Sequence, residues 1–135
     1  MRILILDDNE LRLGLFTDVF GTHQNIMVKE AQSAIAFLQS HAPFDLVMLD
    51  HDLGGEIYVD SDREDCGMEV VRWMEIHKPI ARRVVVHSWN IPAAEIMANR
   101  LTAAGYTVLR APFTKANIQS LRRIHERENP VQRRS

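Results

Sequence analysis

The sequence DLVMLDHDLGG, residues 45–55, contains the features that decide the fold. A short apolar run, residues 45–49, leads directly into Asp50-His51-Asp52, and two glycines follow. A short apolar run closed by a turn is typical of a strand that is buried on both faces of a parallel sheet. Ligand sites in such sheets lie beyond the carboxyl ends of the strands. Because charged groups at a strand exit need partners or solvent, Asp50, His51 and Asp52 are predicted to form part of a functional site.

Similar patterns recur along the chain and predict the fold class. Further strands are expected at residues 3–6, 26–28, 84–86 and 106–109. Apolar residues at helical spacing follow each of the five expected strands. Five alternations of strand and helix predict an α/β domain with a doubly wound parallel sheet.

Three of the expected strands end in polar residues. The three polar exits are Asp7-Asp8-Asn9, Asp50-His51-Asp52 and His87-Ser88-Trp89-Asn90. Right-handed crossover connections bring the carboxyl ends of parallel strands to one edge of the sheet. We therefore expect these side chains, which are distant in sequence, to meet in one pocket.

Periodicity also assigns individual helix positions. Leu11, Ile76 and Ile96 are expected to face the core from three different helices. Ser33 is a candidate N-cap for a helix that ends at His41. The last expected helix has a further N-cap candidate, Thr114.

Composition limits the class of protein. The chain has 135 residues, of which 46% are hydrophobic and 25% are charged, which suits one domain over residues 1–128 with a polar tail at 129–135. A net charge of −2 gives no general attraction to nucleic acid or membrane. The single cysteine, Cys66, excludes an internal disulfide. No apolar run approaches the length of a membrane span or a signal peptide, and we expect a cytoplasmic protein.

The connection over residues 51–67 is long and acidic. Connections after a strand usually take about 2–6 residues, so a longer one is functional or mobile. Two readings stay open: a solvated acidic loop, or a lid over Asp50 that helps to bind a metal ion.

Over residues 1 to about 125, the chain resembles the receiver domains of response regulators. The resemblance implies a flavodoxin-like, three-layer α/β/α fold with five parallel strands in the order 2-1-3-4-5. It also implies roles for particular positions. Asp7-Asp8 matches the magnesium pair, Asp50 the phosphoacceptor aspartate, and Gly67 the helix-opening glycine. Ser88 matches the switch residue, and residues 110–113 match the Lys-Pro-Phe segment.

The departures from this pattern resemble a divergent branch, the cyclic-phosphate processing receiver domains. Ala111 stands where receivers have a lysine that pairs with the phosphorylated aspartate, and His51 and His87 are additions. The resemblance to the branch is carried by residues 6–8 with Arg12, residues 49–54, and His87-Ser88 with Asn90. It implies an activity on cyclic phosphates.

These residues suggest specific chemical roles. Asp7, Asp8 and Asp50 are the predicted metal ligands, with Asp52 as a further candidate, and their hard oxygens suit Mg²⁺ or Mn²⁺. An added histidine ligand would shift the preference toward Mn²⁺ or Zn²⁺.

The remaining site residues have two readings each. His51 and His87 are either the acid and base or further metal ligands, with Asp50 and Ser88 beside them as catalytic candidates. Ser88 and Asn90 would donate to phosphoryl oxygens, although Asn90 could instead cap a helix. Arg12 would neutralise the charge of the phosphate or pair with the acidic residues. Trp89 is either a stacking platform for a base or an exposed hydrophobic residue.

Three functions remain open on the sequence alone. The first is a metal-dependent phosphoesterase that hydrolyses a small or nucleotide-derived cyclic phosphate. The second is a stand-alone receiver phosphorylated on Asp50, which binds a protein partner through its last strand and helix. The third is a pseudo-receiver that binds a partner without metal or phosphate. A divalent ion stabilises the protein in the first two cases and has no effect in the third.

Overall fold

Five parallel strands form one sheet in the order β2-β1-β3-β4-β5. The computed structural model describes residues 2–21 and 24–128, so the predicted tail at 129–135 lies outside the described residues. The strands are β1 (Arg2–Leu6), β2 (Gln24–Val28), β3 (Phe44–Leu49), β4 (Ala81–Val86) and β5 (Val108–Arg110). This order confirms the predicted flavodoxin-like sheet.

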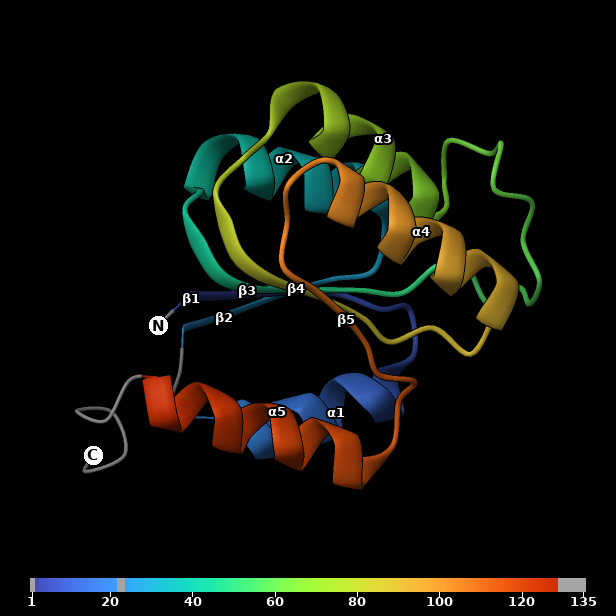
Figure 1. The fold of residues 1–135 in the computed structure, drawn as a ribbon. Helices are drawn as coiled ribbons and strands as arrows, with labels where there is room; N and C mark the ends of the chain where they lie inside the picture. The colour runs from blue at the N-terminus through green and yellow to red at the C-terminus, as the bar shows by residue number, and fades with distance from the viewer. Residues whose placement is uncertain (1, 22–23, 129–135) are drawn as a thin grey trace.

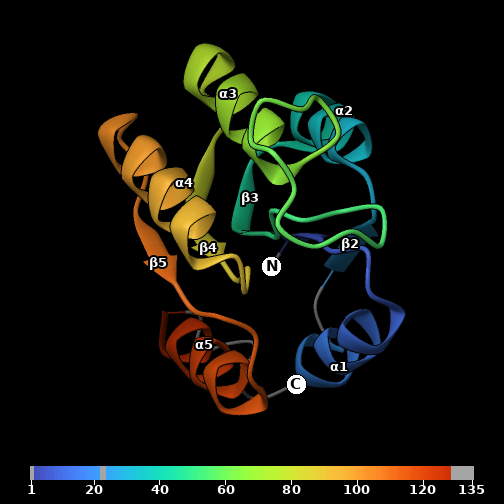
Figure 2. The same cartoon turned by 90° about the vertical axis from the view of Figure 1, so that its right-hand side faces the viewer.

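Helices cover both faces of the sheet and give three layers (Figure 1). The helices are α1 (Glu10–Phe20), α2 (Ala31–His41), α3 (Gly67–His77), α4 (Ile91–Ala103) and α5 (Lys115–Glu128). In Figure 1, α2, α3 and α4 lie on one face and α1 and α5 lie on the other. The second view shows the long loop between β3 and α3 beside the start of α4 (Figure 2). None of the helices within the described residues is both long and apolar enough to cross a membrane.

The central strand β3 is buried on both of its faces, as its apolar sequence predicts. Val47 and Leu49 pack into the core on the side of α2, α3 and α4, whereas Leu46 and Met48 pack on the side of α1 and α5. Because side chains alternate along a strand, a strand between two helical layers needs apolar residues at every position. This burial fixes β3, so that the residues at its end have a defined position.

Gly67 brings α3 close to the end of β3. Its amide donates to the carbonyl oxygen of His51 at 2.9 Å. A Cβ atom at this position would lie only 1.9 Å from the carbonyl oxygen of Asp50, so a larger residue would collide with the backbone. The predicted helix-opening glycine is therefore confirmed, and its role is to allow this close approach.

The predicted inward positions of several helix residues are wrong. Leu11, Ile76 and Ile96 are exposed. In α1 the buried stripe instead contains Leu13 and Phe16, with Phe20 one turn further along. The sequence offers apolar residues on more than one side of this helix, and packing against the sheet selects the stripe at i, i+3 and i+7.

Several element boundaries also differ from the prediction: β2 and β4, for example, begin two and three residues earlier than expected. Ser33 is not an N-cap, because α2 begins at Ala31 and Glu30 occupies the capping position. The last strand is Val108–Arg110 rather than 106–109; the side chain of Tyr106 instead donates from its hydroxyl to the carbonyl oxygen of Pro79 at 2.6 Å. Thr114 is confirmed as a cap, since its Oγ1 accepts from the amide of Asn117 at 3.0 Å.

Candidate functional site

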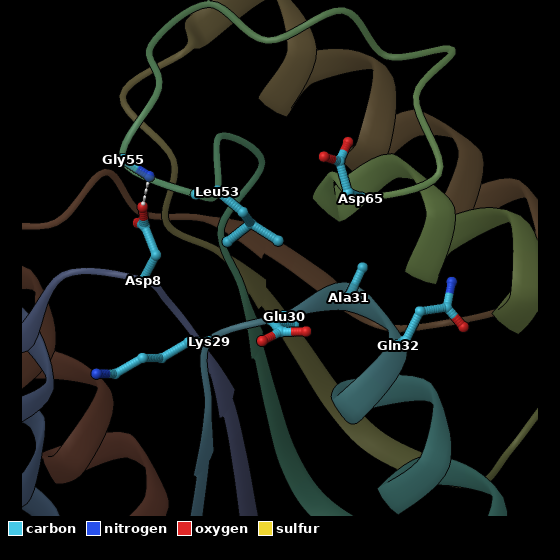
Figure 3. Close-up of a pocket in the computed structure, with 9 residues that line it drawn as sticks. Asp8, Lys29, Glu30, Ala31, Gln32, Leu53, Gly55 and Asp65 are labelled. Atoms are coloured by element: carbon cyan, nitrogen blue, oxygen red, sulfur yellow. Dashed lines mark hydrogen bonds between the residues drawn. The ribbon is translucent and has the colours of Figure 1, made fainter.

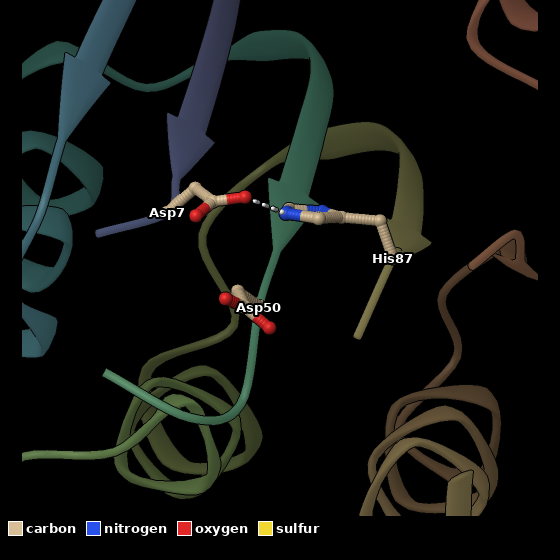
Figure 4. A group of neighbouring side chains, drawn as sticks. All are labelled: Asp7, Asp50 and His87. Atoms are coloured by element: carbon tan, nitrogen blue, oxygen red, sulfur yellow. Dashed lines mark hydrogen bonds and ion pairs between the residues drawn. The ribbon is translucent and has the colours of Figure 1, made fainter. Parts of the chain in front are cut away.

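One residue from each of the three polar strand exits lies in a single buried group. Asp7 follows β1, Asp50 follows β3 and His87 follows β4. Each offers one ligand atom, and these atoms all lie within 4.8 Å of one another. Figure 4 shows the carboxylate of Asp7 directed toward the ring of His87, with Asp50 beside them. The parallel topology thus brings together residues that are far apart in sequence.

Asp7 is buried and binds a guanidinium group as well as a histidine. Its Oδ2 accepts from Nε2 of His87 at 3.0 Å and from Nε of Arg12 at 2.8 Å. Its Oδ1 accepts from Nη2 of Arg12 at 2.8 Å and from the amide of Asn9 at 2.9 Å. Burial raises the pKa of Asp7, but the hydrogen bonds from His87 and Arg12 outweigh this effect and lower the pKa to about 2. Asp7 is therefore a carboxylate that holds Arg12 in a fixed orientation.

Asp50 is a buried carboxyl whose charge is only partly compensated. Its Oδ1 accepts from the amide of His51 at 2.8 Å, and its Oδ2 lies 3.4 Å from Nη2 of Arg12. Burial raises the pKa of Asp50 to about 6; the charge of Asp7 adds to the rise, and the charges of His87 and Arg12 offset only part of it. An additional cation at this position would stabilise the ionised form of Asp50.

The group of Asp7, Asp50 and His87 fits a divalent metal ion. Two carboxylates and an imidazole are a common donor set for Mn²⁺ and related ions. The three ligand atoms lie within 4.8 Å of one another, and Asp50 lacks full charge compensation, which an ion would supply. Arg12 occupies both oxygens of Asp7, so an ion and the guanidinium would compete for the same atoms.

Asp8, another predicted metal ligand, lies outside this group of three. Its Oδ2 accepts from the amide of Gly55 at 2.6 Å, and its Oδ1 is 3.8 Å from Nη2 of Arg12. The first contact ties the exit of β1 to the long loop. In the structure Asp8 is therefore a contact between the site and the loop.

A cavity of about 190 Å³ opens above the buried group. Arg12, Asp50, Ser88 and Asn90 are among its lining residues. The other lining residues are Asp8, Asn9, Asp52, Gly55, Glu56, Ile57 and Trp89. His51 and His87, which the structure describes as fully buried side chains, are not among the lining residues. A molecule in this cavity would meet Arg12 and Asp50 before either imidazole.

His51 turns its ring toward the loop rather than toward the buried group. Its Nδ1 donates to Oδ1 of Asp52 at 2.7 Å, and its Nε2 lies 2.9 Å from Oγ of Ser61. Burial lowers the pKa of His51, but interactions with Cys66 and Asp52 give a net rise. Sequence reasoning missed Ser61 as a partner of His51, because nothing in the spacing of an irregular loop indicates which hydroxyl folds back.

Asp52 organises the loop between β3 and α3. Besides His51, its Oδ1 accepts from Nδ2 of Asn90 and from the amide of Val59, each at 3.1 Å. Its Oδ2 accepts from the amide of Tyr58 at 2.7 Å. Burial raises the pKa of Asp52, but the hydrogen bonds from His51 and Asn90 outweigh this effect and lower it. The predicted metal ligand Asp52 thus has both oxygens engaged by the loop and by the start of α4.

Ser88 and Asn90 connect the exit of β4 to the start of α4. Oγ of Ser88 accepts from the amide of Asn90 at 3.0 Å, which leaves the hydroxyl hydrogen available to the cavity. Oδ1 of Asn90 accepts from the amide of Ala93 at 3.3 Å, so the capping alternative for Asn90 is correct. Its Nδ2 is free to contact Asp52 at the same time.

A second cavity of about 470 Å³ adjoins the first (Figure 3). Asp8 and Gly55 line both cavities, and the hydrogen bond between them joins the exit of β1 to the loop. Of these two cavities, only the second is lined by Lys29, Gln32 and Leu53.

Solved structures similar to this one are receiver domains. The signal receiver domain of a putative LuxO repressor protein from Vibrio parahaemolyticus is 17% identical, with a TM-score of 0.65, over 97% of this chain and 93% of that chain. A CheY-like response regulator receiver domain from Methanospirillum hungatei JF-1 is 16% identical, with a TM-score of 0.61, over 99% of this chain and 98% of that chain. The Mn²⁺-bound form of the response regulator Rcp1 is 19% identical, with a TM-score of 0.61, over 93% of this chain and 91% of that chain. At these identities, the similarity shows the fold alone.

The family is shown by a separate comparison. None of the curated proteins compared matches the chain. The family model for the cyclic-phosphate processing receiver domain matches residues 2–103, which include Asp7, Arg12, Asp50 and His87. The chain therefore belongs to the family of cyclic-phosphate processing receiver domains.

Proposed function

We propose that this protein hydrolyses a cyclic phosphate in the cavity above Asp50. The observation that carries the proposal is the fixed guanidinium of Arg12, which is held by two hydrogen bonds to Asp7 and reaches the cavity wall beside Asp50. A guanidinium fork that is already oriented is well suited to phosphoryl oxygens. The family name, cyclic-phosphate processing, supports the same substrate.

The reaction adds one water to the cyclic ester. The water oxygen forms a new bond to phosphorus, one ring P–O bond breaks, and the leaving oxygen takes up a proton, so that a phosphomonoester with a free hydroxyl results. Arg12 neutralises charge on the phosphoryl oxygens, and the Ser88 hydroxyl donates a hydrogen bond to one of them. The attacking water loses one proton, which balances the proton that the leaving oxygen takes up.

Asp7, Asp50 and His87 would hold a divalent ion, Mg²⁺ or Mn²⁺. Bound there, it would supply Lewis-acid polarisation of the phosphoryl group and a water of lowered pKa. His51 acts through its neighbours in this proposal: it holds Asp52, which in turn binds Asn90. Asp8 and Asp52 remain candidate outer ligands that would first have to leave their contacts with the loop.

Turnover of cyclic phosphates tests the proposal. The protein is incubated with Mg²⁺ or Mn²⁺ and with cyclic phosphates of nucleosides, sugars and glycerol, and the products are separated by anion exchange. We expect a phosphomonoester from at least one substrate, and its loss in the Asp50→Asn variant. A folded, metal-bound protein that turns over none of them would overturn the proposal.

A second candidate function is phosphoryl acceptance by Asp50. Ala111 cannot supply the lysine of ordinary receivers, but Arg12 provides a cation 3.4 Å from Oδ2 of Asp50. Acetyl phosphate would then add one phosphoryl mass to the wild-type protein and none to Asp50→Asn. An unchanged mass at all concentrations would exclude this function.

A further inference from the structure

We propose that the substrate of this cavity is a nucleoside cyclic phosphate, whose base stacks on the indole of Trp89. The inference rests on the proposed function and deepens it by naming the substrate class. Trp89 lines the same cavity as Arg12 and Asp50, so a group on its ring would be continuous with a phosphate beside Arg12. No other aromatic side chain lines this cavity among the described residues.

The size of the cavity indicates that only part of the substrate enters it. Its volume of about 190 Å³ is smaller than the roughly 300–1,000 Å³ of pockets that enclose a whole small ligand. The polar residues Arg12, Asp50 and Ser88 suit the cyclic phosphate end. The rest of the substrate must then lie against the residues at the rim.

Two large hydrophobic residues are exposed at the rim of the cavity, next to the charged side chain of Glu56. Trp89 is 58% exposed and Ile57 is 81% exposed, although both are large hydrophobic residues. They come from different segments, Trp89 from the exit of β4 and Ile57 from the long loop. Exposed hydrophobic side chains beside a polar cavity favour a ligand with one charged and one flat, apolar end. A nucleobase is such an end, because each base presents a π-face that stacks on an aromatic side chain.

The position of this rim is fixed by the contacts of Asp52. Asp52 accepts from the amide of Tyr58, the residue after Ile57, and from Nδ2 of Asn90, the residue after Trp89. One carboxylate thus holds the two segments that carry the rim residues. A stacking surface that is already ordered loses little conformational entropy when a base binds.

The neighbouring cavity of about 470 Å³ is the other place where a base could lie. It holds no aromatic side chain among its lining residues, and Gln32 is one of its hydrogen-bonding groups. Asp8 and Gly55 line both cavities, and a substrate that reached from one to the other would have to pass their hydrogen bond. A base that binds at Trp89 does not have to pass this hydrogen bond. The Gln32→Ala variant tests the alternative, in which the base binds in the neighbouring cavity.

Two substrates with the same five-membered cyclic phosphate distinguish recognition of the base from recognition of the phosphate. They are adenosine 2′,3′-cyclic phosphate and glycerol 1,2-cyclic phosphate. We expect kcat/KM to favour the nucleoside substrate in the wild-type protein. Trp89→Ala should reduce this preference by about 5- to 100-fold, mainly through KM, and Trp89→Phe should restore most of it. Ile76→Ala removes another exposed hydrophobic residue, on α3, and should leave the preference unchanged. Equal kcat/KM values for the two substrates, or a preference lost in Gln32→Ala but not in Trp89→Ala, would overturn the inference.

Tryptophan fluorescence tests the same inference without turnover. The chain has two tryptophans, and Trp73→Phe leaves Trp89 as the reporter. Adenosine 3′-monophosphate should quench its emission by stacking, whereas glycerol phosphate should not. No quenching by the nucleotide would contradict base stacking even if cyclic phosphates are hydrolysed. Quenching without hydrolysis of either cyclic phosphate would contradict the proposed function and leave the nucleotide site standing.

Discussion

Nε2 of His87 lies 3.0 Å from Oδ2 of Asp7, a residue eighty positions earlier in the chain. This contact is the first link of a series in which Asp7 binds Arg12 and Arg12 approaches Asp50. Both oxygens of Asp7 accept hydrogen bonds, and its pKa is lowered. Asp50, by contrast, lines the cavity and has a raised pKa. The site therefore combines a fixed cation, Arg12, with a carboxylate, Asp50, whose negative charge is only partly offset.

Divalent ions should stabilise the protein, because a bound ion would offset the negative charge of Asp50, which the neighbouring side chains offset only in part. At an ion concentration of 100 times Kd, linkage predicts about 2.7 kcal/mol of added stability. We expect a rise in Tm with Mn²⁺ or Mg²⁺, reversal by EDTA, and loss of the effect in Asp50→Asn. The exposed loop variant Asp62→Asn serves as the control and should respond as the wild type does. An equal Tm with and without both ions would contradict the metal site.

Without metal, the Asp50→Asn variant should be more stable than the wild type above pH 6. The pKa of Asp50 rises from 3.8 to about 6 on folding, so the unfolded chain ionises first as the pH increases. The contribution of Asp50 is therefore most favourable below pH 3.8 and is lost between pH 3.8 and about 6. The variant should gain about 1 to 3 kcal/mol at pH 7.5 by urea unfolding in EDTA.

Asp7→Asn should behave in the opposite way. The pKa of Asp7 falls from 3.8 to about 2 on folding, so its contribution to stability is present above pH 3.8 and is lost as the pH falls toward 2. This variant should be less stable than the wild type at pH 7.5. Urea curves in which both asparagine variants change stability in the same direction would refute the contrast between the two carboxylates.

Replacing Arg12 separates its two roles. Arg12→Gln frees the oxygens of Asp7, so metal affinity should increase, while kcat/KM for a cyclic phosphate should fall by about 100-fold. Arg12→Lys keeps the charge but not the bidentate fork, and should recover only part of the activity. Isothermal titration with Mn²⁺ and turnover assays measure the two effects. Weaker metal binding in Arg12→Gln would show that the guanidinium and the ion do not compete.

Asp52 should be required for the order of the long loop. Asp52→Ala removes the acceptor of four hydrogen bonds, from His51, Tyr58, Val59 and Asn90, and should lower stability by about 1 to 3 kcal/mol. Amide hydrogen exchange over residues 53–65 should accelerate more than in Asp62→Ala, a variant of an exposed acidic residue in the same loop. Equal exchange in the two variants would mean that the loop is held by other contacts.

Much of the fold could be predicted from the sequence, because the strand signals are strong. A strand such as β3 needs apolar residues on both faces, and its exit is marked by Asp50. The inward position that periodicity predicts for Leu11 is wrong because α1 carries apolar residues on several sides, and only the packing of Phe16 against the sheet decides between them.

The sequence predicts that the polar strand exits converge, but it does not predict the contacts of their side chains. The convergence of Asp7, Asp50 and His87 follows from the parallel topology, which the alternation of elements already implies. The orientation of His51 toward Ser61 depends on the path of an irregular loop, and no periodicity encodes that path. Charged residues in such a loop have partners that only the folded backbone defines, as Asp52 illustrates.

The central claim, hydrolysis of a cyclic phosphate above Asp50, is tested most directly by ³¹P NMR of the reaction in H₂¹⁸O. We predict that the cyclic phosphate resonance is replaced by that of a phosphomonoester carrying one ¹⁸O, at a rate that falls sharply in Asp50→Asn. An unchanged cyclic phosphate resonance with folded, metal-bound wild-type protein would contradict it.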